Sequence, residues 1–62
     1  MNLSNALNMD PHLLVGLLNT ELRDFSEDLE DLVKTHDLDR DQLIAKMEAA
    51  GYIYQAGQKQ FR

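Results

Sequence analysis

Four acidic residues in the second half of the chain have the spacing of a calcium-binding loop. Asp37, Asp39, Asp41 and Glu48 would occupy positions 1, 3, 5 and 12 of such a loop. Carboxylates at this spacing can wrap Ca²⁺, but the loop also needs a glycine at its sixth position, where this chain has Gln42. Capping of a helix start explains these acids without a metal. We therefore expect no metal site.

Residues that could act as nucleophiles or proton carriers are few and scattered. His12 and His36 lie in different segments, and neither has an acid–base partner in a recognisable pattern. Ser4 and Ser26 lack the glycine elbow and the nearby histidine that activate a serine. The three glycines form no phosphate-binding loop. The sequence therefore predicts a non-enzymatic protein without a cofactor.

Acidic residues dominate the charge of the chain. Eleven Asp and Glu residues against six Lys and Arg residues give a net charge of -5. A run of acids without a base is formed by Asp24, Glu27, Asp28, Glu30 and Asp31. Such a run is typical of a solvated helix face, and it can also steer association with a basic protein partner. Both interpretations stay open.

The length of the chain indicates a single small domain. It has 62 residues, 44% of them hydrophobic, and no cysteine that could form a disulfide. Its longest apolar stretch, residues 13–18, is too short to span a bilayer, and no basic segment typical of a signal peptide precedes it. We expect a cytoplasmic protein that does not bind membranes, with a leader at residues 1–9 and the domain at residues 10–62. Four side chains of the leader could dock on the domain: Leu3, Ala6, Leu7 and Met9.

Caps and apolar spacing predict three helices in the domain. The first begins with Asp10 as its cap and Pro11 at the first helical position, where no amide hydrogen is needed. The second is expected to begin at Ser26. The third follows Asp39 as its cap and ends at Gly51, which suits a left-handed C-terminal residue.

The last part of the chain has the pattern of a β-hairpin. Residues 52–61 have strand character on either side of Ala56–Gly57, which we predict to be a two-residue turn. In that register Tyr52 lies opposite Phe61, and both face the helices together with Tyr54. The predicted fold is mainly α, with three short helices in a helix-turn-helix-like arrangement and a C-terminal β-hairpin, which is winged-helix-like.

This architecture makes a DNA-binding transcriptional regulator the alternative function. The third helix would enter the major groove, and the candidate contacts come from that helix and the hairpin: Arg40, Gln42, Lys46, Lys59 and Arg62. The net charge of -5 opposes this function, because binding to phosphates requires a positive surface. We therefore place DNA binding second and do not expect nucleic acid as a partner.

The first helix carries more apolar surface than one packing partner covers. Its apolar residues span about 200° of the helix, roughly twice the width that a surface helix needs. Leu14, Leu18 and Phe25 lie at the centre of this arc and are expected in the core. The residues at its edges are candidates for self-association: Leu13 and Leu17 on one side, Val15 and Leu22 on the other. The leading hypothesis is therefore an interaction module that forms a homodimer through this helix.

Polar residues cluster near the end of the first helix. They are Asn19, Thr20, Arg23 and Asp24. We expect a structural hydrogen-bonded corner, in which Arg23 bridges Asp24 or the acids of the second helix, because polar groups beside a core need partners.

Several short motifs resemble those of one bacterial family. They are Met-Asp-Pro at residues 9–11, Asn-Thr-x-Leu-Arg-Asp at residues 19–24, Gly-Tyr-x-Tyr at residues 51–54 and Gln-Phe at residues 60–61. With these motifs the chain resembles the domain of unknown function family 4250 over nearly its whole length. The resemblance implies a bacterial cytoplasmic domain. Since the family has no assigned activity, it implies no catalytic or binding residue.

Overall fold

The computed structural model describes residue 3 and residues 5–62, which form three α-helices, a 3-10 helix and a two-stranded antiparallel sheet. The elements are, in chain order, η1 (Ala6–Asn8), α1 (Pro11–Asp24), α2 (Leu29–Thr35), α3 (Arg40–Ala49), β1 (Tyr54–Gln55) and β2 (Gln60–Phe61). The predicted fold of three helices and a C-terminal hairpin is confirmed. None of the helices in this described part of the chain has both the length and the apolar character needed to cross a bilayer.

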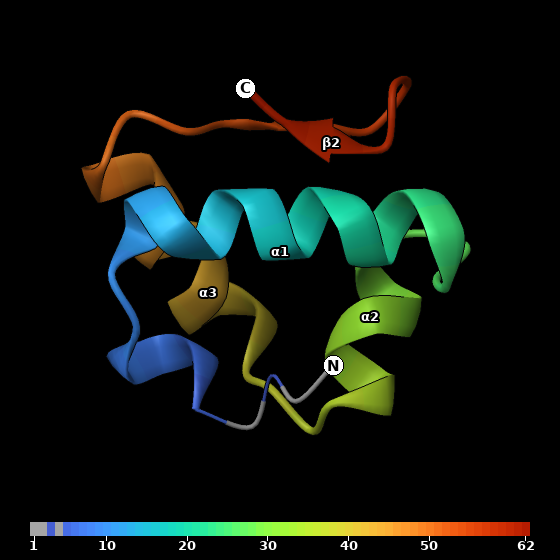
Figure 1. The fold of residues 1–62 in the computed structure, drawn as a ribbon, viewed down its shortest axis with the longest axis horizontal. Helices are drawn as coiled ribbons and strands as arrows, with labels where there is room; N and C mark the ends of the chain where they lie inside the picture. The colour runs from blue at the N-terminus through green and yellow to red at the C-terminus, as the bar shows by residue number, and fades with distance from the viewer. Residues whose placement is uncertain (1–2, 4) are drawn as a thin grey trace.

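Helix α1 lies at the centre of the molecule. The hairpin runs along one side of it, while η1, α2 and α3 lie on the other side (Figure 1). The wide apolar arc of α1 therefore meets two packing partners within one chain. The core between these layers consists of Leu3, Ala6, Leu14, Leu18, Leu22, Leu29, Leu32, Val33, Leu43, Met47 and Phe61. Two of the leader side chains expected to dock, Leu3 and Ala6, are fully buried in it.

Aspartates cap all three α-helices, because a carboxylate oxygen can accept the amide hydrogens that a helix start leaves unpaired. In each case Oδ1 accepts a hydrogen bond from a backbone N–H two or three residues later: Asp10 from His12 (2.9 Å), Asp28 from Asp31 (2.8 Å) and Asp39 from Gln42 (3.1 Å). The predicted caps at Asp10 and Asp39 are confirmed.

The start of α2 at Ser26 was predicted wrongly, since the cap is Asp28. The N–H of Ser26 donates to the carbonyl oxygen of Glu21 at 2.9 Å, so Ser26 still belongs to the closing turn of α1. Its residue surface is only 7% exposed. The chain needs two further residues to leave α1 before a new helix can begin.

Two helices end at a residue in the left-handed conformation. Gly51, with a φ of 91°, follows α3 as predicted. Asp37, with a φ of 55°, plays the same part after α2, and the N–H of Leu38 donates to the carbonyl oxygen of Val33 at 2.8 Å. This bond closes a Schellman-type turn, which directs Leu38 back toward the core and lets α3 begin two residues later.

The hairpin register differs from the prediction. Tyr54, and not Tyr52, lies opposite Phe61, and Gln55 lies opposite Gln60. The connection is therefore the four-residue loop 56–59, in which Lys59 has a φ of 55°. A two-residue hairpin turn needs a first residue that accepts positive φ, and an alanine at that position does not. A longer loop with the left-handed residue at its end avoids this strain.

The side chain of Asn19 fixes the hairpin to α1. Its Nδ2 donates to the carbonyl oxygen of Phe61 at 3.1 Å, and its Oδ1 accepts from the N–H of Phe61 at 2.8 Å. Asn19 thus satisfies both backbone groups of one strand residue, as a neighbouring strand would. It is not part of a corner at the end of α1, where the sequence placed it, although the expected pair of Arg23 and Asp24 does form there.

Two side chains at the C-terminal end of α1 differ from the prediction in their burial. Phe25, expected in the core, is 71% exposed, whereas Leu22, expected on an open edge, is fully buried. The 100° rule holds only within the helix, and Phe25 is the C-cap with a φ of -128°, which turns its side chain away from the core. Leu22 lies one turn earlier, within the helix, and its side chain is part of the core cluster.

Replacing Asn19 by alanine should loosen the hairpin. We expect the free energy of unfolding to fall by about 2 kcal/mol, because two partly buried backbone groups lose their hydrogen bonds. Urea unfolding followed by circular dichroism measures the change. Asn8→Ala is the control, since among the described residues the Asn8 side chain bonds only to the exposed Asn5 side chain. Equal effects of the two substitutions would show that Asn19 does not hold the hairpin.

Removing the cap of α3 should destabilise the protein modestly. We expect Asp39→Ala to cost about 1 kcal/mol. Leu38→Ala should cost more, because this half-buried side chain packs against the core. Melting curves with and without Ca²⁺ test both substitutions. The capping account fails if Asp39→Ala leaves stability unchanged but abolishes a calcium-dependent rise in Tm.

Candidate functional site

One stripe of α1 is only partly covered by the two packing layers, and we call it the α1 outer face. It is formed by Leu13, Gly16, Leu17 and Thr20, which follow the i, i+3, i+4, i+7 spacing of a single helix side. Leu13 is 68% exposed, Gly16 is exposed, and the other two are half-buried. A Cβ at Gly16 would meet no atom within 4 Å, so the stripe has open space at its middle. None of the four side chains is charged.

The structure separates the four residues proposed from sequence for self-association. Leu13 and Leu17 share the outer face, as their spacing indicated. Val15 is half-buried against the core cluster on another side of α1, and Leu22 is fully buried. The second edge of the apolar arc is therefore covered within the chain. Among the described residues, Leu13 is the exposed one of these four, whereas Leu17 beside it is half-buried against the core cluster, as Val15 is.

An exposed ion pair lies at the C-terminal end of α1. Arg23 donates from Nε to Oδ1 of Asp24 at 2.9 Å and from Nη2 to Oδ2 at 3.0 Å. Hydrogen bonding from this guanidinium lowers the pKa of Asp24 below its ordinary value. Because water screens both groups, the pair contributes little to stability.

The residues proposed as DNA contacts do not form a basic surface. Arg40 is paired with Glu30, and its Nη1 lies 3.7 Å from Oδ1 of Asp41. The ammonium of Lys59 donates to the carbonyl oxygen of Ser26 at 2.8 Å. Gln42 and Arg62 are exposed and Lys46 is half-buried. Two of the four cations are thus engaged within the chain, and acids of α3 lie among the others.

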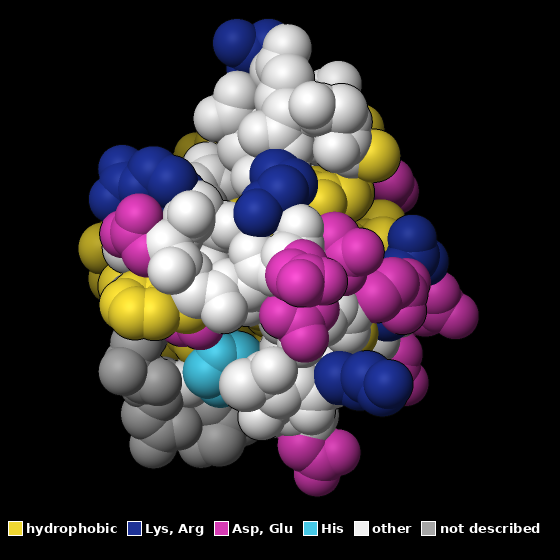
Figure 2. Space-filling model, turned by 90° about the vertical axis from the view of Figure 1, so that its right-hand side faces the viewer, with side chains coloured by type: hydrophobic (Ala, Val, Ile, Leu, Met, Phe, Trp, Pro, Cys, Tyr) yellow, Lys and Arg dark blue, Asp and Glu magenta, His cyan; other side chains and the backbone are white. Residues whose placement is uncertain are grey.

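Acidic side chains gather at the end of the molecule where α2 begins. Figure 2 shows them on the face that looks toward the viewer after the quarter turn. They include Glu27, Asp28, Glu30 and Asp31. Two of these carboxylates have structural roles: Asp28 caps α2, and Oδ2 of Asp31 accepts from the N–H of Glu27 at 3.0 Å. The predicted acidic run therefore combines helix capping with a solvated surface.

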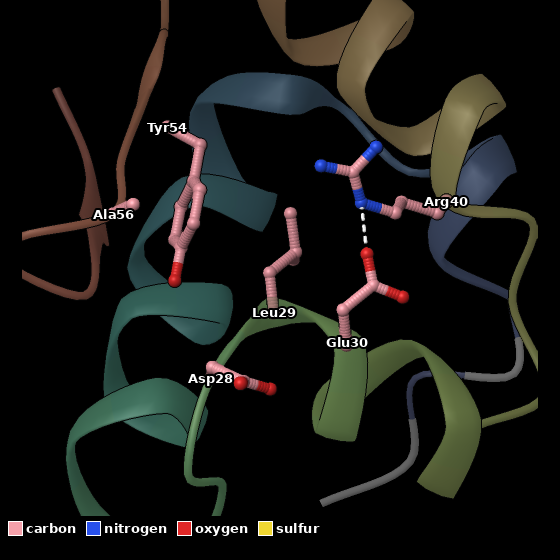
Figure 3. Close-up of a pocket in the computed structure, with 6 residues that line it drawn as sticks. All are labelled: Asp28, Leu29, Glu30, Arg40, Tyr54 and Ala56. Carbon is pink, nitrogen blue, oxygen red and sulfur yellow. Dashed lines mark ion pairs between the residues drawn. The ribbon is translucent and has the colours of Figure 1, made fainter.

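A cleft of about 320 Å³ opens beside these acids. It lies where the starts of α2 and α3 meet the hairpin and is lined by Asp28, Leu29, Glu30, Arg40, Tyr54 and Ala56 (Figure 3). Sequence reasoning did not bring these residues together. The acids and Arg40 were noted separately, but the place of Tyr54 and Ala56 depends on the four-residue hairpin loop, which has no clear sequence signal.

The two histidines have structural partners. Nδ1 of His12 lies 2.8 Å from the hydroxyl oxygen of Tyr52, and their rings meet edge to face. Nε2 of His36 lies 3.3 Å from Oε2 of Glu21, and both side chains are mostly buried, at 14% and 7% exposure. This contact does not have the geometry of a hydrogen bond, so Nε2 of His36 is buried without a hydrogen-bond partner among the described residues. Among the described residues, neither histidine is hydrogen-bonded to a serine or threonine hydroxyl.

The remaining sequence candidates have simple places in the structure. Asp39 caps α3 and Asp37 ends α2, while Asp41 and Glu48 are exposed. In residue 3 and residues 5–62, no three potential ligands from His, Cys, Asp or Glu come together as a metal site would require. Ser26 is buried, and Ser4 lies outside the described residues.

Comparison with known proteins relates the chain to one family. The family model described as Domain of unknown function (DUF4250) matches residues 8–61. No curated protein and no solved structure matches the chain. The match spans all the α-helices, the hairpin, the α1 outer face and the cleft.

The charge arrangement predicts that duplex DNA is not retained. We expect no measurable binding at about 150 mM salt, because counterion release requires several free cations on one face. Fluorescence anisotropy with a labelled random-sequence duplex tests this expectation. Micromolar binding that is weakened by reversing the charges of Arg40 and Lys46 would instead support the DNA-binding alternative.

Proposed function

The chain belongs to the DUF4250 family, and we propose that it is a non-enzymatic interaction module that associates with a second copy of itself through the α1 outer face. The observation that carries the proposal is the 68% exposure of Leu13 on a regular helix beside the open space at Gly16. Leu13 adjoins Gly16 and the half-buried Leu17 in an uncharged stripe, and contiguous apolar surface, unlike a single exposed side chain, marks contact sites.

Charge opposes a second copy least at the α1 outer face. The chain has a net charge of -5, so two copies repel each other over most of their surfaces. The α1 outer face has no charged side chain from Leu13 to Thr20. It is therefore a surface on which two copies can meet without bringing like charges together.

The spacing of the face is compatible with two-fold symmetry. In an antiparallel pair of α1 helices centred between Gly16 and Leu17, Leu17 of each copy would lie over Gly16 of the other. Leu13 would then lie beside Thr20, and Arg23 would approach Asp10 across the interface. The side chain missing at Gly16 has no explanation in the monomer, since a Cβ there would meet nothing. In the pair it provides room for Leu17.

The alternative function, a winged-helix-like DNA-binding regulator, is supported by the order of α2, a short turn, α3 and a hairpin. The pairing of Arg40 with Glu30 and of Lys59 with Ser26 argues against it, as does the net charge. We therefore place it second.

Self-association predicts a mass twice the monomer mass of 7.1 kDa. Light scattering at about 100 µM should give the dimer mass, and Tm should rise with protein concentration. Leu13→Lys should give a monomer of lower Tm, because it places a charge in the interface while remaining soluble on an exposed position. Ile53→Lys is the matched control, since Ile53 is 46% exposed and lies outside the face.

Gly16→Ala separates a helix effect from an interface effect. In a monomer this substitution should stabilise α1 by roughly 0.5–1 kcal/mol, because alanine restricts the unfolded chain and favours helix. In the proposed dimer it would fill the space needed by Leu17 and weaken association. A wild-type mass near that of the monomer at about 100 µM, with a Tm independent of concentration, would exclude the proposed function.

A further inference from the structure

The cleft between the start of α2, the start of α3 and the hairpin has an apolar floor and one aromatic wall. Leu29, only 2% exposed, forms the floor, and Ala56 lies at the rim. The Tyr54 ring stands opposite the pair formed by Glu30 and Arg40, with Leu29 between them (Figure 3). Tyr54 is itself supported by Phe61, whose ring centroid lies 5.3 Å away. The wall is therefore fixed to the core.

Carboxylates flank this apolar surface. Asp28 and Glu30 both line the cleft, and both residues are exposed to water. Oδ1 of Asp28 caps α2, and among the described residues no hydrogen bond engages its Oδ2. An incoming donor can therefore reach one oxygen of Asp28 without breaking the cap.

Arg40 demonstrates which chemistry the cleft accommodates. Its guanidinium lies beside Leu29 and forms an ion pair through Nε with Oε1 of Glu30 (Figure 3). A cation with an apolar stem is thus already held by one carboxylate at the edge of the apolar floor. The part of the cleft between Tyr54 and Asp28 offers the same elements, with an aromatic face in addition. A cation over a tyrosine ring gains further attraction from the ring electrons.

The surroundings of the cleft are complementary to a basic partner. Arg40 is the one base among the described lining residues, and Lys59 of the hairpin loop is engaged nearby with the carbonyl oxygen of Ser26. Glu27 and Asp31 belong to the same end of the molecule, where acids outnumber bases. The net charge of -5 adds long-range attraction for a cationic segment. We propose that this cleft binds a lysine or arginine side chain presented by a basic peptide segment of a partner protein. This inference goes beyond the proposed self-association and uses none of the residues of the α1 outer face.

A short fluorescein-labelled peptide of alternating arginine and alanine is a suitable probe. Asp28→Asn should weaken its binding about fivefold, because asparagine keeps the helix cap and removes the negative charge. Glu48→Gln is the control, since it makes the same change of charge on α3 outside the cleft. A peptide with glutamate in place of arginine should not bind. Fluorescence anisotropy at low and at physiological salt measures all of these affinities.

The opposite effect is expected when the internal guanidinium is removed. Arg40→Gln should strengthen peptide binding about threefold, because the Glu30 carboxylate becomes available to the peptide. Lys34→Gln is the control, since it makes the same charge change outside the cleft and should have a smaller effect.

In an NMR titration with the arginine peptide, the signals of Tyr54 and Ala56 should shift. The proposal is overturned if each variant and its control change affinity equally, if the glutamate peptide binds as well, or if these signals do not move. Because the mass of the protein is measured separately, failure here leaves the self-association test unaffected.

Discussion

Two hydrogen bonds between the Asn19 side chain and the backbone of Phe61 connect the hairpin to the rest of the molecule. A two-stranded ribbon is only marginally stable by itself. The amide offers Phe61 a donor and an acceptor at the place where a third strand would lie, so one helix residue completes the sheet. Phe61 can then remain 2% exposed in the core while its backbone groups are satisfied.

Both surfaces described above depend on this attachment. The hairpin covers one side of α1, the other helices cover the opposite side, and the stripe from Leu13 to Thr20 remains. A chain of 62 residues does not have enough surrounding structure to enclose its central helix completely. The same hairpin places Tyr54 against Phe61 and thereby forms one wall of the cleft. The α1 outer face and the cleft thus both result from the way the hairpin and the other helices cover α1.

The acidic character of the molecule has a structural origin as well as an electrostatic effect. Asp10, Asp28 and Asp39 each satisfy amide hydrogens at a helix start, where the helix dipole also favours negative charge. The starts of α2 and α3 come close enough for Glu30 to pair with Arg40. The capping groups of α2 and α3 and their acidic neighbours therefore lie near one another, whereas Asp10 caps α1 at its far end (Figure 1). Surface charge and helix stability cannot be varied independently there.

Local physics explains which features were predictable from the sequence. The caps at Asp10 and Asp39 and the left-handed Gly51 depend on neighbours within a few residues, so their sequence signals were sufficient. The three helices and the hairpin followed from apolar periodicity and turn residues. The predicted start of α2 was wrong because the N–H of Ser26 donates to the carbonyl oxygen of Glu21, so Ser26 belongs to the turn that ends α1.

Only the tertiary structure decided the hairpin register, the partner of Asn19 and which edge of α1 stays open. Each of these depends on contacts between residues far apart in sequence, such as Asn19 and Phe61, and the conformational preferences of neighbouring residues do not predict such contacts. The register places Tyr54 in the cleft, and the packing order buries Leu22 while leaving Leu13 exposed. The sequence by itself determined the elements and most of the helix ends, because these depend on hydrogen bonds between near neighbours. The surfaces depend on which elements cover one another, and that is settled only when the whole core packs.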